Sequence, residues 1–273
     1  MRTKSGKKWL VLPVAGLLIA VLVLTACGGE AKKTITEAGS TTVQPLAEKL
    51  SNAFMASNPN VEITIQGGGS SVGVKSVDNG TVDIGAISRE LKPGEPALVK
   101  HLLVRDGIAI IANPSNTVNG LTKEQVRNIF AGNIVNWSEV GGPDEDIHII
   151  AREEGSGTRT AFEDIVMGKE GPYVGKSAIL QPSNGAIMTG VGSDAQSIGF
   201  VSFGYLDSSV KALAIDGVEG TVANAKNGSY PVVRSLYFLT KAQPEGVVKE
   251  FIDYCLGTEG QRIVTEEGYI SAD

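Results

Sequence analysis

Three short clusters of glycine and hydroxyl residues are the parts of this sequence whose chemistry is easiest to recognise. Each follows an apolar, strand-like segment and precedes a segment with helical spacing; the clusters are residues 39–42 (GSTT), 67–71 (GGGSS) and 155–158 (GSGT). The first turn of a helix has free backbone N–H groups and the positive end of the helix dipole, and both attract anions. Ser and Thr are also ordinary N-cap residues, so one cluster alone would mean little. Three of them in one chain predict a site for a small anion.

Two arginines follow predicted strands close to these clusters. Arg152 comes directly after the strand-like residues 147–151 and before the third cluster, while residues 82–87 are followed by Ser88 and Arg89. A guanidinium group can present two parallel N–H donors to a tetrahedral oxyanion. Arg152 is therefore the predicted charged ligand of the anion.

Strand-like and helical segments alternate along the chain, which predicts an α/β fold with largely parallel sheets. Val43, Leu46, Leu50 and Phe54, for example, form one apolar stripe, and this spacing predicts a helix that ends at Asn58. The predicted strands are residues 34–38, 61–65, 82–87, 103–112, 147–151, 198–203 and 232–240.

The N-terminus has the pattern of an export signal. Four basic residues precede a sixteen-residue run without charge, from Trp9 to Leu24, which contains Pro13 and is short for a membrane-spanning helix. The run ends in Leu-Thr-Ala-Cys, which resembles the bacterial lipobox. We therefore expect residues 1–26 to be a signal peptide, Cys27 to be lipidated, and residues 27–33 to form a tether. A plain secretory signal and an uncleaved anchor are the alternatives.

The composition argues against several classes of function. Removal of the signal peptide takes away four positive charges and changes the formal net charge from −6 to −10, which does not suit a surface that binds nucleic acid. The two histidines and two cysteines do not cluster with metal-ligand spacing, so we expect neither a metal nor another cofactor. Cys255 lies in a segment of helical spacing and is expected to be a buried, inert thiol.

Six segments together resemble the phosphate-binding proteins of ABC phosphate importers. The resemblance runs in the expected order from about residue 34 to the C-terminus and is carried by residues 38–41, 69–71, 83–86, 121–142, 152–158 and 198–202.

The resemblance implies a bilobal periplasmic-binding-protein type II fold, with two α/β domains joined by a two-strand hinge. Residues 34–108 with 230–273 would form domain I, and residues 109–229 domain II. Phosphate would bind between the domains, and Glu154 would hold the arginine. The family's phosphate ligands carry over to Thr41, Ser70, Arg152, Ser156, Gly157 and Thr158. We add Ser40 as a further donor and Ser88 as a further ligand. The partners implied are inorganic phosphate and the permease and ATPase subunits of an importer. We expect a monomer, anchored by lipid at the extracytoplasmic face of the cell membrane.

Ser88 departs from the pattern of that family. Many members have an aspartate at this position, which accepts a proton from bound hydrogen phosphate; a serine can accept a hydrogen bond but does not repel sulfate by charge. Sulfate or another tetrahedral oxyanion is therefore the alternative ligand.

Two other classes of protein fit the sequence less well than a receptor. A serine hydrolase would use Ser156, but Glu154 occupies the first glycine position of the Gly-x-Ser-x-Gly motif, and neither His101 nor His148 has a catalytic setting. A structural or adhesive lipoprotein would account for the anchor but not for the anion donors. The sequence therefore favours binding over catalysis.

Overall fold

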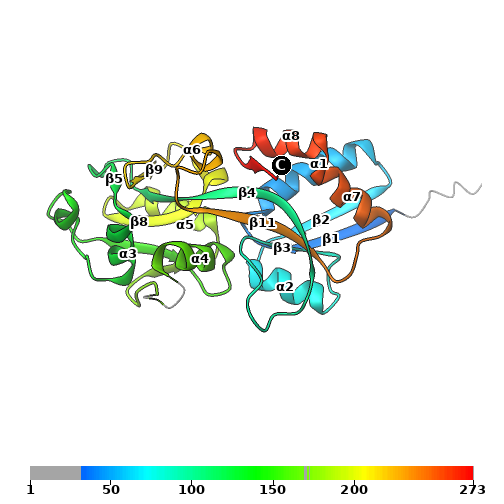
Figure 1. Ribbon diagram of the computed structural model, residues 1–273, viewed down its shortest axis with the longest axis horizontal. Helices are drawn as coiled ribbons and strands as arrows, with labels where there is room; N and C mark the ends of the chain where they lie inside the picture. The colour runs from blue at the N-terminus through cyan, green and yellow to red at the C-terminus, as the bar shows by residue number, and fades with distance from the viewer. Residues whose placement is uncertain (1–31, 169–170, 172, 273) are drawn as a thin grey trace, which may run out of the picture. The chain divides into compact units, whose positions relative to one another are not determined.

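Two strands carry the chain between two hydrophobic cores in a computed structural model of this protein. The structure describes residues 32–168, 171 and 173–272, so the predicted signal peptide and Cys27 lie outside the described residues. Strand β4 (Val99–Ala112) and strand β11 (Val233–Thr240) pair antiparallel along most of their length, and Figure 1 shows them side by side. Residues 32–273 form one compact unit.

The remaining elements follow the predicted alternation of strands and helices. The other strands are β1 (Lys33–Gly39), β2 (Val61–Gln66), β3 (Ile84–Ile87), β5 (Gly120–Leu121), β6 (His148–Arg152), β7 (Ile179–Gln181), β8 (Ser197–Ser202), β9 (Lys211–Ala212), β10 (Ala214–Ile215) and β12 (Ile270–Ser271). The α-helices are α1 (Gln44–Ser57), α2 (Ser70–Asp78), α3 (Lys123–Ala131), α4 (Gly157–Phe162), α5 (Asn184–Ser193), α6 (Val222–Lys226), α7 (Gly246–Leu256) and α8 (Thr258–Glu266).

The main sheet has the strand order β2-β1-β3-β11-β4-β8-β6-β7. The pairs β1–β2, β1–β3, β6–β7 and β6–β8 are parallel, as expected for strands linked by helical crossovers. Strand β11 is antiparallel to β3 and β4, and β4 is antiparallel to β8. The predicted α/β class is confirmed. The expectation of largely parallel sheets holds at both ends of the sheet but not in its middle, because β11 returns the chain against the direction of β4.

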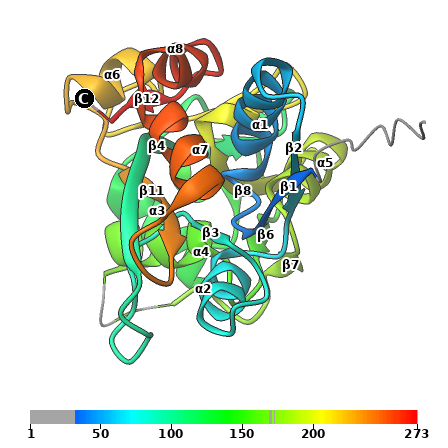
Figure 2. The ribbon, with the colours of Figure 1, turned by 90° about the vertical axis from the view of Figure 1, so that its right-hand side faces the viewer.

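Two groups of elements surround the two cores. The first core contains Ile35, Leu46 and Phe251, and the second contains Phe130, Phe162 and Phe200. We call the elements around the first core lobe I (β1–β3, α1, α2, α7 and α8) and those around the second lobe II (β6–β8 and α3–α6). In lobe I, α1 and α7 lie on one side of β1–β3 and α2 lies on the other (Figure 2). Along β4, the side chains pass from the first core at Val104 to the second core at Ile108.

Helix α1 shows how local sequence sets these elements. Leu46, Ala47, Leu50 and Phe54 are buried in the first core, which confirms the predicted apolar stripe. Cys255 is also buried in this core with a free thiol, which confirms the expected burial, and burial raises the pKa of this thiol. Among the described residues, no helix has the length and apolar character required to cross a bilayer.

Glu37 is a carboxyl group buried in lobe I. It is 1% exposed, and its Oε2 has no hydrogen-bond partner among the described residues. Burial, and secondarily the charge of Glu48, raise the pKa of Glu37 well above its ordinary value of 4.5. The folded protein therefore holds this proton at pH values where the unfolded chain has lost it.

We expect the free energy of unfolding to fall as pH rises from about 4.5 towards the raised pKa of Glu37. The full stability is present below 4.5, because both states are then protonated at this residue. Each tenfold change in the acid constant corresponds to about 1.4 kcal/mol. Glu37→Gln should remove this slope and unfold at a higher urea concentration than the wild type at neutral pH. Glu62→Gln, which removes the same charge from an exposed site on β2, is the control; equal pH slopes in all three proteins would contradict the prediction.

Candidate functional site

The starts of four helices meet where lobe I faces lobe II. Helix α1 begins just after the first predicted cluster, α2 and α4 begin within the second and third clusters, and α5 begins at Asn184. Contacts between the lobes join them. Thr42 Oγ1 lies 2.8 Å from Thr158 Oγ1, Asn184 Nδ2 donates to Thr42 Oγ1 at 3.0 Å, and Ser71 N donates to the carbonyl of Gly155 at 3.1 Å. The structure thus brings the three predicted clusters into one place.

Glycine is required where α4 approaches lobe I. A β-carbon placed on Gly157 would lie 2.1 Å from Ser70 Oγ and 2.5 Å from Ser88 Oγ, closer than side-chain atoms can approach. The predicted ligands Ser70, Ser88 and Gly157 are therefore neighbours across the two lobes.

Arg152 is the predicted charged ligand of the anion. It ends β6, is 1% exposed, and donates from Nε to the carbonyl of Gln181 at 3.2 Å and from Nη2 to the carbonyl of Pro182 at 2.8 Å. Burial, and secondarily the positive charge of Arg234, lower its pKa to about 10, so it remains a cation at neutral pH. Arg152 makes no ion pair with the described carboxylates. A buried cation without a paired anion is a strong attraction for an anionic ligand.

Four hydroxyl groups of the site are oriented as donors by their own neighbours. A hydroxyl that accepts from an N–H group keeps its own hydrogen for another partner. The acceptors and their N–H donors are Ser40 Oγ with Thr42 N (3.2 Å), Thr41 Oγ1 with Asn184 Nδ2 (3.3 Å), Ser70 Oγ with Ser88 N (3.0 Å) and Ser156 Oγ with Arg159 N (3.2 Å). All four side chains are less than 9% exposed. The site is therefore rich in oriented donors, as a dehydrated anion requires.

Ser88 is different from these four. Its hydroxyl is 3.4 Å from Ser70 Oγ, and no N–H group of the described residues donates to it. Either hydroxyl of this pair could be the donor, and Ser88 Oγ, which accepts from no N–H group, keeps the capacity to accept a hydrogen. Ser88 is thus the residue of the site that suits a protonated ligand.

The predicted role of Glu154 differs from what the structure shows, and Arg89, which had no predicted role, is held away from the anion. Glu154 was expected to hold Arg152, but it is exposed and forms no hydrogen bond with Arg152; the carbonyls of Gln181 and Pro182 hold the guanidinium instead. Arg89, whose side chain could have reached the anion, is bound to Glu95 through both Nη atoms at 2.8 and 2.7 Å. Its charge therefore fixes the loop after Ser88.

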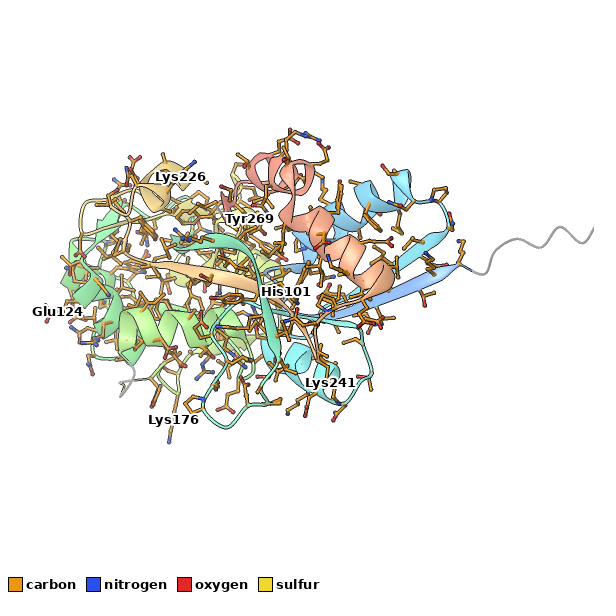
Figure 3. The ribbon with its side chains drawn as sticks, turned by 45° about the vertical axis from the view of Figure 1, so that its right-hand side comes forward. His101, Glu124, Lys176, Lys226, Lys241 and Tyr269 are labelled. Atoms are coloured by element: carbon orange, nitrogen blue, oxygen red, sulfur yellow. The ribbon has the colours of Figure 1, made fainter. Side chains whose placement is uncertain are left out.

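The histidines do not form a catalytic pair with Ser156. His101 lies on β4 (Figure 3), and its Nε2 is 2.9 Å from Thr240 Oγ1. His148 Nδ1 is 2.7 Å from Asp194 Oδ2. Within the described residues, no group of three or more His, Cys, Asp or Glu side chains is arranged to hold a metal ion.

The comparisons with known proteins agree with this geometry. A family profile described as "PBP superfamily domain" matches residues 25–259. The phosphate-binding protein PstS of Bacillus subtilis is 34% identical, over 98% of this chain and 94% of that protein. The chain belongs to the PstS family of phosphate-binding proteins, within the PBP superfamily.

Solved structures of similar proteins support the same assignment for this PstS-family chain. A putative phosphate ABC transporter substrate-binding protein from Clostridium perfringens, with bound phosphate, has a TM-score of 0.84 at 38% identity and covers 88% of this chain and 100% of that one. An ABC-type phosphate transport receptor from Vibrio cholerae has a TM-score of 0.73 at 34% identity, covering 86% and 99%.

Four residues near the site were not predicted from the sequence: Asp106, Asn184, Tyr205 and Arg234. Thr42 belongs to the first predicted cluster but was not among the predicted ligands, and Asn184 begins α5. The Tyr205 hydroxyl donates to the carbonyl of Thr41 at 2.6 Å, and burial raises its pKa to about 12, which keeps it a neutral donor. A usable signal existed for Asp106 and Arg234, because charged residues stand inside the predicted apolar strands 103–112 and 232–240.

Proposed function

We propose that this PstS-family protein is an extracytoplasmic receptor that binds inorganic phosphate between its two lobes and delivers it to an ABC importer. The observation that carries the proposal is the environment of Arg152. This buried cation has no paired carboxylate among the described residues, and α4, the helix that follows it, meets hydroxyl groups of lobe I at Gly157 and Thr158. The similar proteins named for phosphate binding and phosphate transport support the choice of ligand.

Ligand capture would use the movement of two domains. The proposed domain I comprises residues 34–108 and 230–273, and domain II comprises residues 109–229. Ser70 and Ser88 lie on one side and Ser156 and Thr158 on the other, so the donors of both sides reach one anion only when the domains are together. Phosphate would bind the closed state more tightly than the open state, so it would shift the population towards the closed state.

Calorimetric titration of the purified mature protein with phosphate, sulfate and arsenate tests the function. One phosphate bound per chain, with phosphate and arsenate bound more tightly than sulfate, is the expected result. No heat of binding with phosphate at micromolar to millimolar concentration would reject the proposal. Equal affinity for sulfate and phosphate would reject phosphate as the specific ligand and favour a general oxyanion receptor.

Ser88 should determine the preference for phosphate over sulfate. Phosphate carries a proton near neutral pH and sulfate does not, so only phosphate can donate to Ser88 Oγ. Ser88→Ala should weaken phosphate binding by roughly five- to ten-fold, the effect of one lost hydrogen bond, and leave sulfate binding nearly unchanged. Ser88→Asp should bind phosphate and exclude sulfate by charge. Titration of each variant with both anions is the measurement.

Ser51→Ala is the matched control, because Ser51 is also buried but lies on α1, where its hydroxyl donates to the carbonyl of Glu48. Parallel losses of phosphate and sulfate affinity in Ser88→Ala would show that Ser88 acts as a donor, contrary to the prediction.

Membrane attachment and partners are further parts of the proposal. We propose that residues 1–26 are removed, that Cys27 carries the lipid, and that the receptor acts as a monomer on the permease and ATPase subunits of the importer. The lipobox-like sequence before Cys27 supports the anchor. Labelled palmitate that is still incorporated into Cys27→Ser would reject lipidation at this residue.

Binding, without catalysis, is the proposed activity of the site. Ser156 Oγ accepts a hydrogen bond from the backbone of Arg159 in its own helix, and the histidines are engaged with Thr240 and Asp194. A nucleophilic serine would need a general base within hydrogen-bonding reach. Turnover of a phosphomonoester or a chromogenic ester that is lost in Ser156→Ala would contradict the proposal.

A further inference from the structure

A buried ion pair lies where the chain crosses between the lobes. Arg234, on β11, donates from Nε and Nη2 to Asp106 Oδ2 on β4, at 3.1 and 2.8 Å. Ser202 of β8 donates to the other carboxylate oxygen at 2.8 Å. Burial raises the pKa of Asp106 above its ordinary value, and the charge and hydrogen bonds of Arg234 and the hydrogen bond of Ser202 act against this rise. Asp106 is 1% and Arg234 6% exposed, so the pair is held rigidly by its surroundings.

Arg234 also reaches lobe I. Its Nη2 donates to Thr42 Oγ1 at 3.2 Å, and its Nη1 donates to the carbonyl of Ser88 at 3.3 Å. Arg234 thus joins the crossing strands to the residue beside Thr41 and to Ser88 itself.

The directions of the hydrogen bonds around Thr42 can be deduced from the donors. Arg234 Nη2 and Asn184 Nδ2 can only donate, and both point at Thr42 Oγ1. The amide of Asn184 is oriented by its Oδ1, which accepts from Ser202 N at 3.4 Å. With both acceptor positions of the Thr42 hydroxyl occupied, its own hydrogen is left for Thr158 Oγ1 at 2.8 Å.

Thr158 consequently accepts from Thr42 and has its own hydrogen free for a ligand. Thr158 belongs to α4, which begins five residues after Arg152 at the end of β6. The chain of bonds therefore ends in the helix that follows the cation of the proposed anion site.

We propose that Arg234, held by Asp106, is a positioning residue for anion binding. It acts through Thr42, fixing the Thr158 hydroxyl as a donor to the bound anion and joining lobe I to lobe II in the closed state. This inference rests on the proposed function, because it assigns roles within the same site. It adds three residues to that site, none of which contacts the anion directly.

Replacement of Thr42 tests the hydrogen-bond chain from Arg234 to Thr158 at its middle residue. Thr42→Val keeps the branched shape but leaves two buried N–H groups without an acceptor, so phosphate affinity should fall roughly ten-fold or more. Thr42→Ser keeps the hydroxyl and should bind within about three-fold of the wild type. The Thr158 hydroxyl would donate to phosphate and to sulfate alike, so the ratio of phosphate to sulfate affinity should stay unchanged, in contrast to Ser88→Ala. Thr240→Val is the matched control, since Thr240 is a buried threonine at the far end of β11.

Replacement of Arg234 tests whether it acts through Thr42. Lysine keeps the charge beside Asp106 but lacks the fork of donors that reaches both Asp106 and Thr42. Arg234→Lys alone should weaken phosphate binding about as much as Thr42→Val does. In the Thr42→Val background it should cost little more, because neighbours in one network give non-additive effects. Thermal unfolding of each variant checks that the fold is intact.

The titrations separate this inference from the function it rests on. A wild-type protein that does not bind phosphate overturns the proposed function and the inference together. A wild type that binds phosphate, with Thr42→Val within about three-fold of it, overturns the inference alone. Additive losses in the double variant likewise overturn it, because Arg234 would then act by another route. Loss in Thr42→Val with rescue in Thr42→Ser supports it.

Discussion

Arg152→Met is expected to reduce phosphate affinity by roughly 10²- to 10⁴-fold. A guanidinium that binds an oxyanion through two charge-assisted hydrogen bonds contributes about 1.5–3 kcal/mol for each of them. Burial strengthens the effect, because Arg152 is 1% exposed and water cannot replace its charge. The protein has a formal net charge of −6 as a full chain, which repels anions at long range, so local positive charge must provide the attraction. Titration calorimetry with phosphate and sulfate should show a large loss for both anions.

The arginine variants need controls for fold and for geometry. Arg127→Met removes a half-buried arginine of lobe II whose Nη2 donates to the carbonyl of Met167, and it should leave binding unchanged. Arg152→Lys keeps a charge but loses the hydrogen bonds to both Gln181 and Pro182, so it should recover only part of the affinity. A loss of less than about five-fold in Arg152→Met, with an intact thermal transition, would remove Arg152 from the site.

The parts of the site that obey local rules could be predicted from the sequence. A glycine and hydroxyl cluster after an apolar run is a local signal, and the structure places a helix start at or just after each of the three clusters. The burial of the predicted ligands could also be expected from the sequence, because they follow predicted strands of both lobes. Family resemblance then supplied the order of the segments and the identity of the anion, which local patterns alone do not give.

The parts that depend on distant contacts could not be predicted in this way. Arg234 and Asp106 are separated by 127 residues in the sequence, and their pairing becomes visible only once β11 is placed beside β4. The expected contact between Glu154 and Arg152 was wrong for a related reason. Its position near Arg152 in the sequence suggested a contact, but the backbone turns at Gly155, which has a positive φ of 89°, and Glu154 is left exposed.

Gly157→Ala is expected to weaken phosphate binding on the order of 100-fold while the protein still folds. The added methyl group would overlap Ser70 and Ser88 of lobe I, at 2.1 and 2.5 Å from their hydroxyl oxygens. Overpacking of this kind costs roughly 1–3 kcal/mol when the structure can relax, and here relaxation means that the lobes move apart. Gly157 begins α4 and does not have the positive φ that favours glycine, so alanine should not strain the backbone itself.

Gly185→Ala separates closure from a general effect of alanine. Gly185 also lies in the first turn of a helix, α5, but a β-carbon there would meet only Ser183 Oγ, at 3.9 Å. Small-angle scattering should show the wild type and Gly185→Ala becoming more compact with phosphate, whereas Gly157→Ala should not change. Gly157→Ala that binds phosphate as the wild type does would mean that α4 does not approach Ser70 and Ser88 in the bound state. Because Arg152 remains in this variant, a large loss would show that charge alone is not enough and that donors from both lobes must meet on the anion.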